Sequence, residues 1–201
     1  MTAAASLETG LSPREVDLVR SAYRVIGDKG VHGISLQDVA DAAGVSKGVP
    51  SYYFKTKENL ILTTMRWVLS RVADRIEASL AQAHTPQEQV AGMVDAIFVD
   101  PEANRRYYVA YLDLVDYAAR LDTFQQLSDT FDTIVNGLYA DVARAFGVPD
   151  LDEAARVTRA IIDGLFVQWL TESDRVATYD RYRATTKRAL LAYLTSDVPR
   201  A

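Results

Sequence analysis

The chain has 201 residues but no cysteine and only two histidines. The lack of cysteine excludes disulfides and thiolate metal sites, and we expect a cytoplasmic location. His32 and His84 lie far apart in the sequence without the spacing of metal ligands, so we expect no metal site. A Gly-rich phosphate loop and a nucleophile motif are also missing. We therefore predict no catalytic residues, no cofactor and no enzyme activity.

Long apolar runs are also absent. None approaches the roughly 18 residues that a membrane-spanning helix needs, so we expect no membrane partner. Residues 1–11 lack the basic start and the apolar stretch of a signal peptide, and we interpret them as a disordered arm. The rest of the chain is able to form a sizeable core, because 49% of the residues are hydrophobic.

Positive charge is scarce overall and unevenly placed. The net charge of −5 argues against a protein coated with basic residues. Residues 1–60 carry seven Lys/Arg and seven Asp/Glu, whereas the remaining residues carry 15 and 20. A DNA-binding protein needs only a local basic patch. The acidic excess therefore indicates that the C-terminal part faces away from any nucleic acid.

Helix signals dominate the sequence, and strand signals are nearly absent. We predict an all-α fold of about nine helices, because capping residues recur before segments with helical apolar spacing. The predicted starts are Ser12-Pro13, Ser35, Ser46, Thr56, Thr85-Pro86, Asp100-Pro101, Asp122, Asp152 and Tyr179. The predicted ends are Gly30, Gly44, His84, Leu121, Gly147, Ser173 and Thr195.

The segment from Ser35 to Leu60 carries the most specific signal. Two short helices are predicted here on either side of a turn that contains Gly44. This arrangement is typical of a helix-turn-helix, whose second helix enters the DNA major groove. The second helix and its surroundings hold the residue types that bind DNA, namely Lys47, Tyr52, Tyr53, Lys55 and Lys57.

The predicted eighth helix is apolar on more than one face. One stripe begins with Ala154 and Val157, and a second contains Ile162 and Phe166. A helix with apolar residues around most of its girth must be buried on two sides. We expect a second subunit to cover one of these faces.

In its motifs the chain resembles the tetracycline-repressor (TetR) family of one-component bacterial regulators. The matching segments are Ser35–Ala40 (SLQDVA), Ala43–Gly48 (AGVSKG), Tyr53–Leu60 (YFKTKENL) and, more weakly, Ile161–Leu165 (IIDGL). The resemblance implies a helix-turn-helix DNA-binding domain, residues 12–58, and a larger ligand-binding and dimerisation domain, residues 59–201. It also implies a homodimer. Pro50-Ser51 stands where a Leu-Tyr pair is common in the family. With a serine at position 51, the chain resembles the branch of the family that includes the choline–betaine repressor.

The resemblance also implies roles for individual residues. Lys47 would donate to guanine O6 and N7, and Gly48 would let base edges approach closely. Ser46, Tyr52 and Lys57 would touch phosphates, whereas Tyr53 fits phosphate contact and domain packing equally well. Phe54 is expected in the core. The complete predicted DNA-binding set is Ser35, Gln37, Ser46, Lys47, Gly48, Val49, Ser51, Tyr52, Tyr53 and Lys57.

In the family, the fourth to seventh helices enclose a ligand cavity. The candidate lining residues are Trp67, Phe98, Tyr107, Tyr108, Tyr111, Phe131, Asn136, Tyr139 and Trp169. The competing interpretation is that these residues form ordinary core, with Asp113 and Asp116 on a solvent face. The candidate dimer-interface residues are Ile161, Leu165, Tyr182, Leu190 and Tyr193.

The sequence thus predicts a ligand-responsive transcriptional repressor that a small molecule releases from a palindromic operator. The expected partners are a double-stranded DNA operator, a second copy of the chain and a small-molecule effector. We expect a hydrophobic or aromatic effector first and a cationic one second, because tyrosine offers an apolar ring with a polar tip. The alternative is a helical protein-binding adaptor without specific DNA binding, against which the Lys/Tyr cluster argues.

Overall fold

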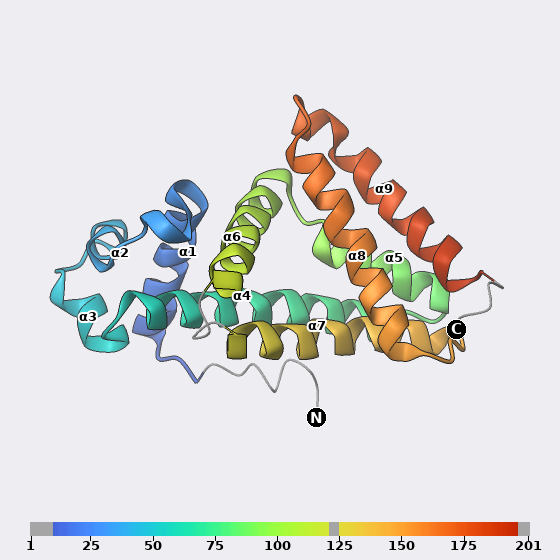
Figure 1. The fold of residues 1–201 in the computed structure, drawn as a ribbon, viewed down its shortest axis with the longest axis horizontal. Coiled ribbons are helices and arrows are strands. Elements are labelled where there is room, and N and C mark those ends of the chain that lie inside the picture. The colour runs from blue at the N-terminus through green and yellow to red at the C-terminus, as the bar shows by residue number, and fades with distance from the viewer. Residues whose placement is uncertain (1–9, 121–124, 197–201) are drawn as a thin grey trace. The chain divides into compact units, whose positions relative to one another are not determined.

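The computed structural model describes residues 10–120 and 125–196, without the side chains of residues 114, 117–120 and 125–132. Within these ranges the chain forms nine helices and no strand, which confirms the predicted all-α fold (Figure 1). The chain divides into two compact units. The first unit comprises Met1–Arg71 and Arg105–Phe131, and the second comprises Val72–Asn104 and Asp132–Ala201. We describe each unit by itself.

The first unit contains the helix-turn-helix. Its helices are α1 (Pro13–Gly33), α2 (Leu36–Ala43), α3 (Gly48–Phe54), the first part of α4 (Lys57–Leu80) and most of α6 (Pro101–Arg120). α6 belongs here because Ala110 lies in the same buried cluster as residues of α1 and α4. The compact units therefore do not follow the boundary that the sequence placed between residues 58 and 59.

The core of the first unit joins all of its helices. Every helix contributes at least one side chain that is at most 8% exposed, and Phe54 of α3 is 2% exposed. The expectation that Phe54 is a core residue is thus confirmed. The cluster consists of Leu18, Val19, Ala22, Val25, Ile26, Val31, Ile34, Val39, Phe54, Leu60, Ile61, Met65 and Ala110.

The second unit contains the rest of α4, α5 (Pro86–Ile97), the start of α6 up to Asn104, the part of α7 (Gln125–Ala145) from Asp132 onward, α8 (Leu151–Leu170) and α9 (Arg175–Leu194). α9 packs along α8 and also contacts α5 (Figure 1). An aromatic cluster fills the space between these helices. Phe98 stacks on Phe166 with 4.2 Å between ring centroids, and Trp169 meets Tyr179 edge-on at 5.3 Å.

Most helix starts follow the predicted caps. Ser12, Ser35 and Thr85 each cap their helix as predicted, and each forms a capping box, in which the hydroxyl accepts a backbone N–H from the third helical residue. Thr56 likewise accepts from the backbone N–H of Asn59 at 3.1 Å at the start of α4. These bonds span only three residues, and for this reason the sequence reveals them.

Three predicted starts differ from the structure, and one lies outside the described residues. α8 begins at Leu151, one residue before the predicted Asp152, with Asp150 as its N-cap. α3 begins one residue later than predicted, with Lys47 and not Ser46 at the N-cap and without a side-chain cap. α9 begins at Arg175, because the Asp174 carboxylate accepts the backbone N–H of Ala177 at 2.9 Å. This acid was not recognised as a cap. The predicted cap at Asp122 falls in the segment that is not described.

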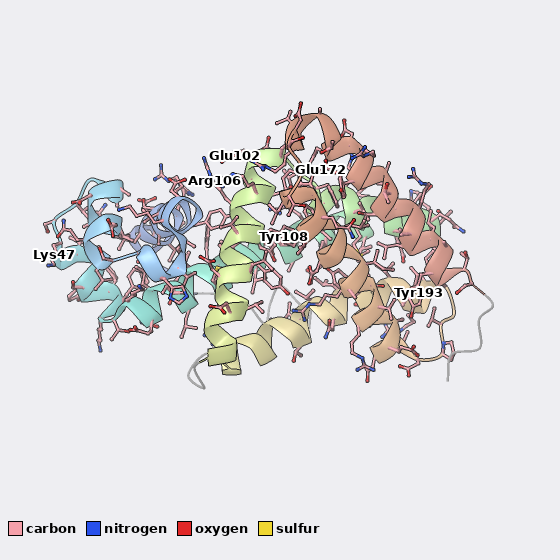
Figure 2. The ribbon with its side chains drawn as sticks, turned by 45° about the horizontal axis from the view of Figure 1, so that its top comes forward. Lys47, Glu102, Arg106, Tyr108, Glu172 and Tyr193 are labelled. Carbon is pink, nitrogen blue, oxygen red and sulfur yellow. The ribbon has the colours of Figure 1, made fainter. Side chains whose placement is uncertain are left out.

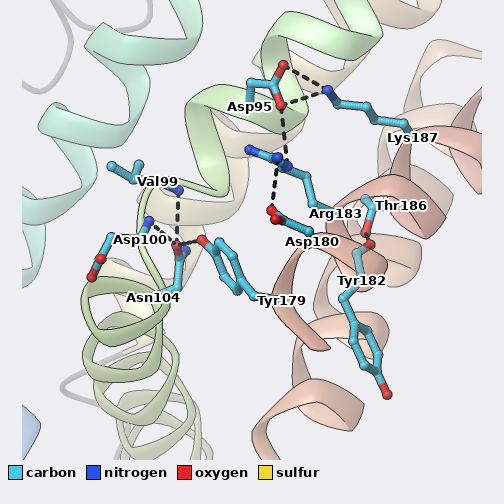
Figure 3. A network of polar contacts seen from close by, with 10 residues as sticks. All are labelled: Asp95, Val99, Asp100, Asn104, Tyr179, Asp180, Tyr182, Arg183, Thr186 and Lys187. Carbon is cyan, nitrogen blue, oxygen red and sulfur yellow. Dashed lines mark hydrogen bonds and ion pairs between the residues drawn. The ribbon is translucent and has the colours of Figure 1, made fainter. Parts of the chain in front are cut away.

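A buried amide ties α9 to the segment between α5 and α6. Asn104 is 5% exposed, and its Oδ1 accepts from the backbone N–H groups of Val99, at 3.1 Å, and Asp100, at 3.3 Å (Figure 3). The same oxygen accepts the hydroxyl of Tyr179, and Asn104 Nδ2 donates to the carbonyl of Ile97 at 2.9 Å. Burial raises the pKa of Tyr179, so this hydroxyl stays protonated as a donor. One side chain therefore makes four hydrogen bonds, two of them fully buried.

Around this buried amide, ion pairs join α5 to α9. Lys187 Nζ lies 2.7 Å from Asp95 Oδ1, and the guanidinium of Arg183 lies near both Asp95 and Asp180 (Figure 3). Asp95 is half-exposed, and solvent-exposed pairs of this kind contribute little to stability. The buried Asn104 is therefore the stronger link between these helices.

We expect Asn104→Ala to destabilise the chain by about 3 kcal/mol, because several buried polar groups lose their partner at once. Tyr179→Phe is the matched control. It removes only one of these hydrogen bonds and should cost about 1 kcal/mol. Urea unfolding followed by circular dichroism measures both values. Equal losses in the two variants would contradict a central role for the amide.

Candidate nucleic-acid interface and effector region

The short helix α3 presents one face to the core and one to solvent. Pro50 and Phe54 are buried, whereas Lys47 and Gly48 are exposed and Tyr52 is 78% exposed. Figure 2 shows Lys47 at the outer edge of the helix-turn-helix. We call Ser46, Lys47, Gly48, Ser51 and Tyr52 the open face of α3. A lysine and a large exposed ring on such a face are groups that contact phosphates and base edges.

Two glycines shape the turn before this face in different ways. Gly44 ends α2 in the left-handed conformation with φ 65°, which a side chain disfavours. Gly48 has no such backbone requirement, and an added Cβ at Gly48 would meet nothing within 4 Å. Packing within the chain therefore gives no reason for glycine at position 48. A close approach by another molecule, such as DNA, does give one.

The junction between α3 and α4 is a tight turn centred on Lys55. Lys55 has φ 63° and ψ −50°, and the backbone N–H of Thr56 donates to the carbonyl of Phe54 at 2.6 Å. These angles and this bond define a γ-turn of the rare, strained form. Asn59 Nδ2 donates to the same carbonyl at 3.0 Å. Asn59 thus holds the turn that sets the angle of α3, a role that the sequence did not reveal.

Several predicted DNA contacts are already used inside the chain. Ser35 is part of the capping box of α2, and Gln37 Nε2 donates to Asp41 Oδ1 at 2.7 Å. Lys57 Nζ donates to the carbonyl of His32 at 2.7 Å, although an ammonium keeps two further donors. On α3 itself, the Ser51 hydroxyl donates to the Lys47 carbonyl at 3.2 Å.

Val49 and Tyr53 pack against the core of the first unit, from partly buried positions. Tyr53 also meets the ring of Tyr52 edge-on at 5.2 Å. Of its two expected roles, domain packing is thus the one that the contacts support for Tyr53. Ser46 and Gly48 lie on the exposed side of the turn.

A charge interaction links α1 to the start of α2. The carboxylate of Asp38 accepts from Lys29 Nζ, from the Ser35 hydroxyl and from the Ser35 backbone N–H. The hydrogen bond from Lys29 is the main reason why the pKa of Asp38 falls to about 2. Asp38 therefore stays ionised throughout the physiological pH range, and the capping box keeps its charge.

The predicted effector residues of the first unit gather on α6. The rings of Tyr107 and Tyr111 are parallel, with centroids 6.3 Å apart, and Tyr108 meets both edge-on at 5.1 and 6.0 Å. Tyr108 is 3% exposed and Tyr111 is 7% exposed. Trp67 of α4 packs against the core of the same unit.

The other predicted effector residues belong to the second unit. Phe98 and Trp169 lie in the aromatic cluster, and Trp169 Nε1 donates to the carbonyl of Arg175 at 2.8 Å, so packing within the chain accounts for their burial. Tyr139 is buried as well, and Asn136 Oδ1 is buried without a hydrogen-bond partner among the described residues. The side chain of Phe131 is outside the described residues.

The predicted interface residues have unlike environments. On α8, Ile161 and Leu165 are half-buried in the single chain, whereas Ile162 and Phe166 are fully buried. On α9, Leu190 is fully buried within its own chain, so its assignment to an interface surface is wrong. Tyr182 is partly buried, and its hydroxyl donates to Glu172 Oε1 at 2.7 Å, which raises the pKa of Tyr182. Tyr193 is also partly buried.

The structure places one of two acids of α6 differently from the sequence-based interpretation. Asp113 and Asp116 were expected on a solvent face or beside a cationic ligand. Asp113 Oδ2 instead accepts the backbone N–H of Val31 at 2.9 Å. Asp116 is exposed, as on a solvent face, and its Oδ2 lies 3.6 Å from His32 Nε2. No short sequence pattern reveals these contacts, because 82 residues separate Asp113 from Val31.

Among the described residues, no group of three His, Asp or Glu side chains is placed to hold a metal ion. No helix in this part of the chain has the length and apolar character needed to cross a membrane.

The chain matches two family models. The model for bacterial regulatory proteins of the tetR family covers residues 18–64, and the model for the C-terminal domain of BetI-type transcriptional repressors covers residues 86–195. Among curated proteins, the chain is 28% identical to the HTH-type transcriptional regulator BetI of Brucella suis, over 82% of this chain and 84% of the relative. It is 26% identical to BetI of Serratia proteamaculans, over 88% and 90%.

Solved structures share the fold. A transcriptional regulator from Saccharomonospora viridis in complex with choline gives a TM-score of 0.75 at 24% identity, and the match covers 88% of this chain and 95% of that one. A TetR transcription regulator from Haloarcula marismortui gives 0.76 at 22% identity, with 92% and 97% covered. Because the C-terminal model alone spans more than half of the sequence, the chain belongs to the tetR family of bacterial transcriptional regulators, as a ligand-responsive DNA-binding repressor with a BetI-type C-terminal domain.

Proposed function

We propose that the chain acts as a homodimer that reads an inverted-repeat operator with α3 and leaves it when a small cationic molecule binds. The open face of α3 is the observation that carries this proposal. A seven-residue helix that buries Pro50 and Phe54 leaves Lys47, Gly48 and Tyr52 to solvent. A helical adaptor that binds only protein would not need this combination of an exposed lysine, a glycine without a side chain and an exposed tyrosine ring.

In this proposal some residues of the open face contact the bases, and others contact the phosphates. Lys47 donates to the edge of a guanine, and Gly48 lets the helix backbone approach the bases. Ser46 and Tyr52 contact phosphates and fix the register of the helix on the duplex. Lys57 adds a phosphate contact through the donors that His32 leaves unused.

The outer face of α8 supports the dimer. Val157, Ile161 and Leu165 recur every fourth residue and are half-buried, while the opposite stripe of the helix is fully buried. Gly164 lies beside this apolar row, and a Cβ there would meet nothing within 4 Å. Small residues beside an apolar row allow two helices to approach closely. A two-fold dimer would bury the same face on both subunits.

The tyrosines of α6 support a cationic effector. Three phenol rings lie within 6.3 Å of one another, and two of them are almost fully buried. The faces of such rings attract a quaternary ammonium group. The C-terminal domain is of the BetI type, and the similar regulator from Saccharomonospora viridis binds choline. We therefore propose a cation of the choline type as the effector, in preference to the hydrophobic or aromatic molecule that the sequence alone favoured.

The DNA proposal predicts that Lys47→Ala weakens binding to the operator by about 1–3 kcal/mol and relaxes the preference at one base position. Lys55→Ala is the control, because it removes an equal charge at the other end of α3. It should lower the salt dependence of binding without changing base preference. Lys57 is unsuitable as a control, since it also holds the carbonyl of His32.

These affinities are measured by fluorescence anisotropy on a duplex selected from random DNA with the unmodified protein. An unchanged affinity and an unchanged base preference for Lys47→Ala would contradict the docking of α3. The selected sequences should contain two half-sites about 34–36 Å apart, or a multiple of that distance.

The dimer proposal predicts that Ile161→Lys raises the dimer dissociation constant by at least about tenfold, because each charge meets an apolar face in the partner. Helix content should stay the same, since Ile161 is only half-buried in the single chain. Val167→Lys places the same charge elsewhere on α8, at a side chain that is 41% exposed, and should have little effect. Sedimentation velocity at micromolar concentration measures the populations of monomer and dimer. A monomeric unmodified protein under these conditions would rule out the dimer.

The effector proposal predicts that choline raises the melting temperature and lowers operator affinity. Its uncharged isostere 3,3-dimethylbutan-1-ol should do neither, because it has the same shape but no charge for the rings to attract. Tyr107→Leu should weaken the response to choline and Tyr107→Phe should retain it. If the neutral isostere acts as well as choline, the effector is apolar and the charge-based proposal fails.

A further inference from the structure

Helix α1 breaks at Gly30, just before its last turn. Gly30 has φ 75° and ψ 167°, a backbone conformation that is essentially restricted to glycine. The break interrupts the helical hydrogen bonds, so the following backbone N–H needs another partner. That N–H belongs to Val31, which is fully buried within its own chain. A buried backbone donor without a partner would be costly.

The missing partner comes from α6. Asp113 Oδ2 accepts the N–H of Val31 at 2.9 Å. The contact is so close that a Cβ on Gly30 would lie 2.6 Å from the same oxygen. One turn earlier, a Cβ on Gly27 would lie 2.9 Å from Arg106 Cγ of α6. Two glycines of α1 thus make room for α6, and Gly30 is required both by its φ angle and by the carboxylate.

The residues around this contact also hold the two helices of the DNA-binding motif. We call Lys29–His32 the α1 junction. Lys29 binds the Asp38 carboxylate, which belongs to the capping box of α2. The carbonyl of His32 accepts from Lys57, the first residue of α4, which directly follows the turn after α3. Four consecutive residues therefore connect α6 to the start of α2 and to the start of α4.

We propose that Asp113 is a positioning residue for DNA binding, which acts through the α1 junction on the placement of the recognition helix. The inference rests on the proposed DNA-binding role of α3. The Asp113 carboxylate fixes the Val31 N–H, and with it the orientation of the neighbouring Lys29 side chain and His32 carbonyl. Those two groups hold the beginnings of α2 and α4. α3 lies between α2 and α4 in the chain, so its position follows from both.

The place of Asp113 on α6 connects this role to the effector. Asp113 follows Tyr111 by two residues on the same helix, within the first unit. A ligand that shifts α6 would move the carboxylate relative to Val31. Hydrogen bonds weaken steeply with distance and angle, so a small displacement is enough to release the junction. The ligand shifts this equilibrium only through its different affinities for the two states.

The test compares four forms of the full chain: the unmodified protein, Asp113→Ala, Asp113→Asn and Asp116→Asn. The asparagine keeps an oxygen at the position of the acceptor, so it should restore what alanine removes. Asp116→Asn is the matched control on the same helix, where the acid lies near the exposed side chain of His32. The DNA probes are the selected duplex and a random duplex of equal length. Amide exchange reports on the peptides that cover residues 27–34.

We expect Asp113→Ala to lose about tenfold or more in affinity for the selected duplex and less than about twofold for the random duplex. Amide exchange should accelerate at residues 27–34 and stay unchanged in the first turns of α1. Asp113→Asn should recover most of the affinity, and Asp116→Asn should behave like the unmodified protein.

Other outcomes would overturn the inference. An Asp113→Ala protein with faster exchange at Val31 but unchanged affinity would show that the junction does not position α3. Equal losses on both duplexes, or equal losses in Asp113→Ala and Asp116→Asn, would indicate a general effect of stability or charge. If Asp113→Ala does not fold, Asp113→Asn takes its place. Slow exchange at residues 27–34 together with lowered affinity in Asp113→Asn would likewise show that the junction does not position α3. Failure of the unmodified protein to prefer its selected duplex would instead refute the proposed function.

Discussion

The DNA-binding surface depends on keeping a very short helix in place. α3 has seven residues, and an isolated helix of that length is not stable in water. Phe54 anchors the end of α3 in the core. Gly44, in the left-handed conformation, sets the direction of the chain before α3, and the strained turn at Lys55 sets its direction after α3. The backbone strain at Lys55 is tolerated because Asn59 and Thr56 both support the turn. The side chains of Lys47 and Tyr52 on the open face of α3 are consequently exposed to solvent, as the proposed contact with DNA requires.

The same principle explains why several predicted contacts have a second role. Gln37 and Lys57 each carry groups that suit phosphates, yet each is bonded to a neighbour in its own unit. Such bonds hold the side chain in one orientation, which in the proposed docking leaves less conformational entropy to be lost on binding DNA. For Lys57 the same bond is also part of the α1 junction. Within this proposal, such a residue contributes to folding and to binding, and no single substitution separates the two contributions.

In the second unit, the side chain of one buried residue, Asn104, makes several hydrogen bonds. Asn104 and Tyr179 fix how α9 meets the segment before α6, and the aromatic cluster fills the space around them. Two aromatic residues of this cluster, Phe98 and Trp169, were open to two interpretations in the sequence, as core or as ligand contacts. Their close ring contacts now account for their burial. The aromatic residues of α6, which lie in the first unit, are in turn the stronger candidates for an effector.

The sequence by itself determined the helices, the helix-turn-helix and the exposed lysine of α3, because these depend on bonds and periodicities within a few residues. A capping box joins positions three apart, and a glycine with positive φ ends a helix whatever surrounds it. Periodicity also revealed the two-sided apolar character of α8. It could not show that Leu190 is fully buried, because burial depends on which elements pack together. Only the tertiary structure brought Asp113 to Val31 and Lys57 to His32, because hydrogen bonds between residues 82 and 25 positions apart have no local signature.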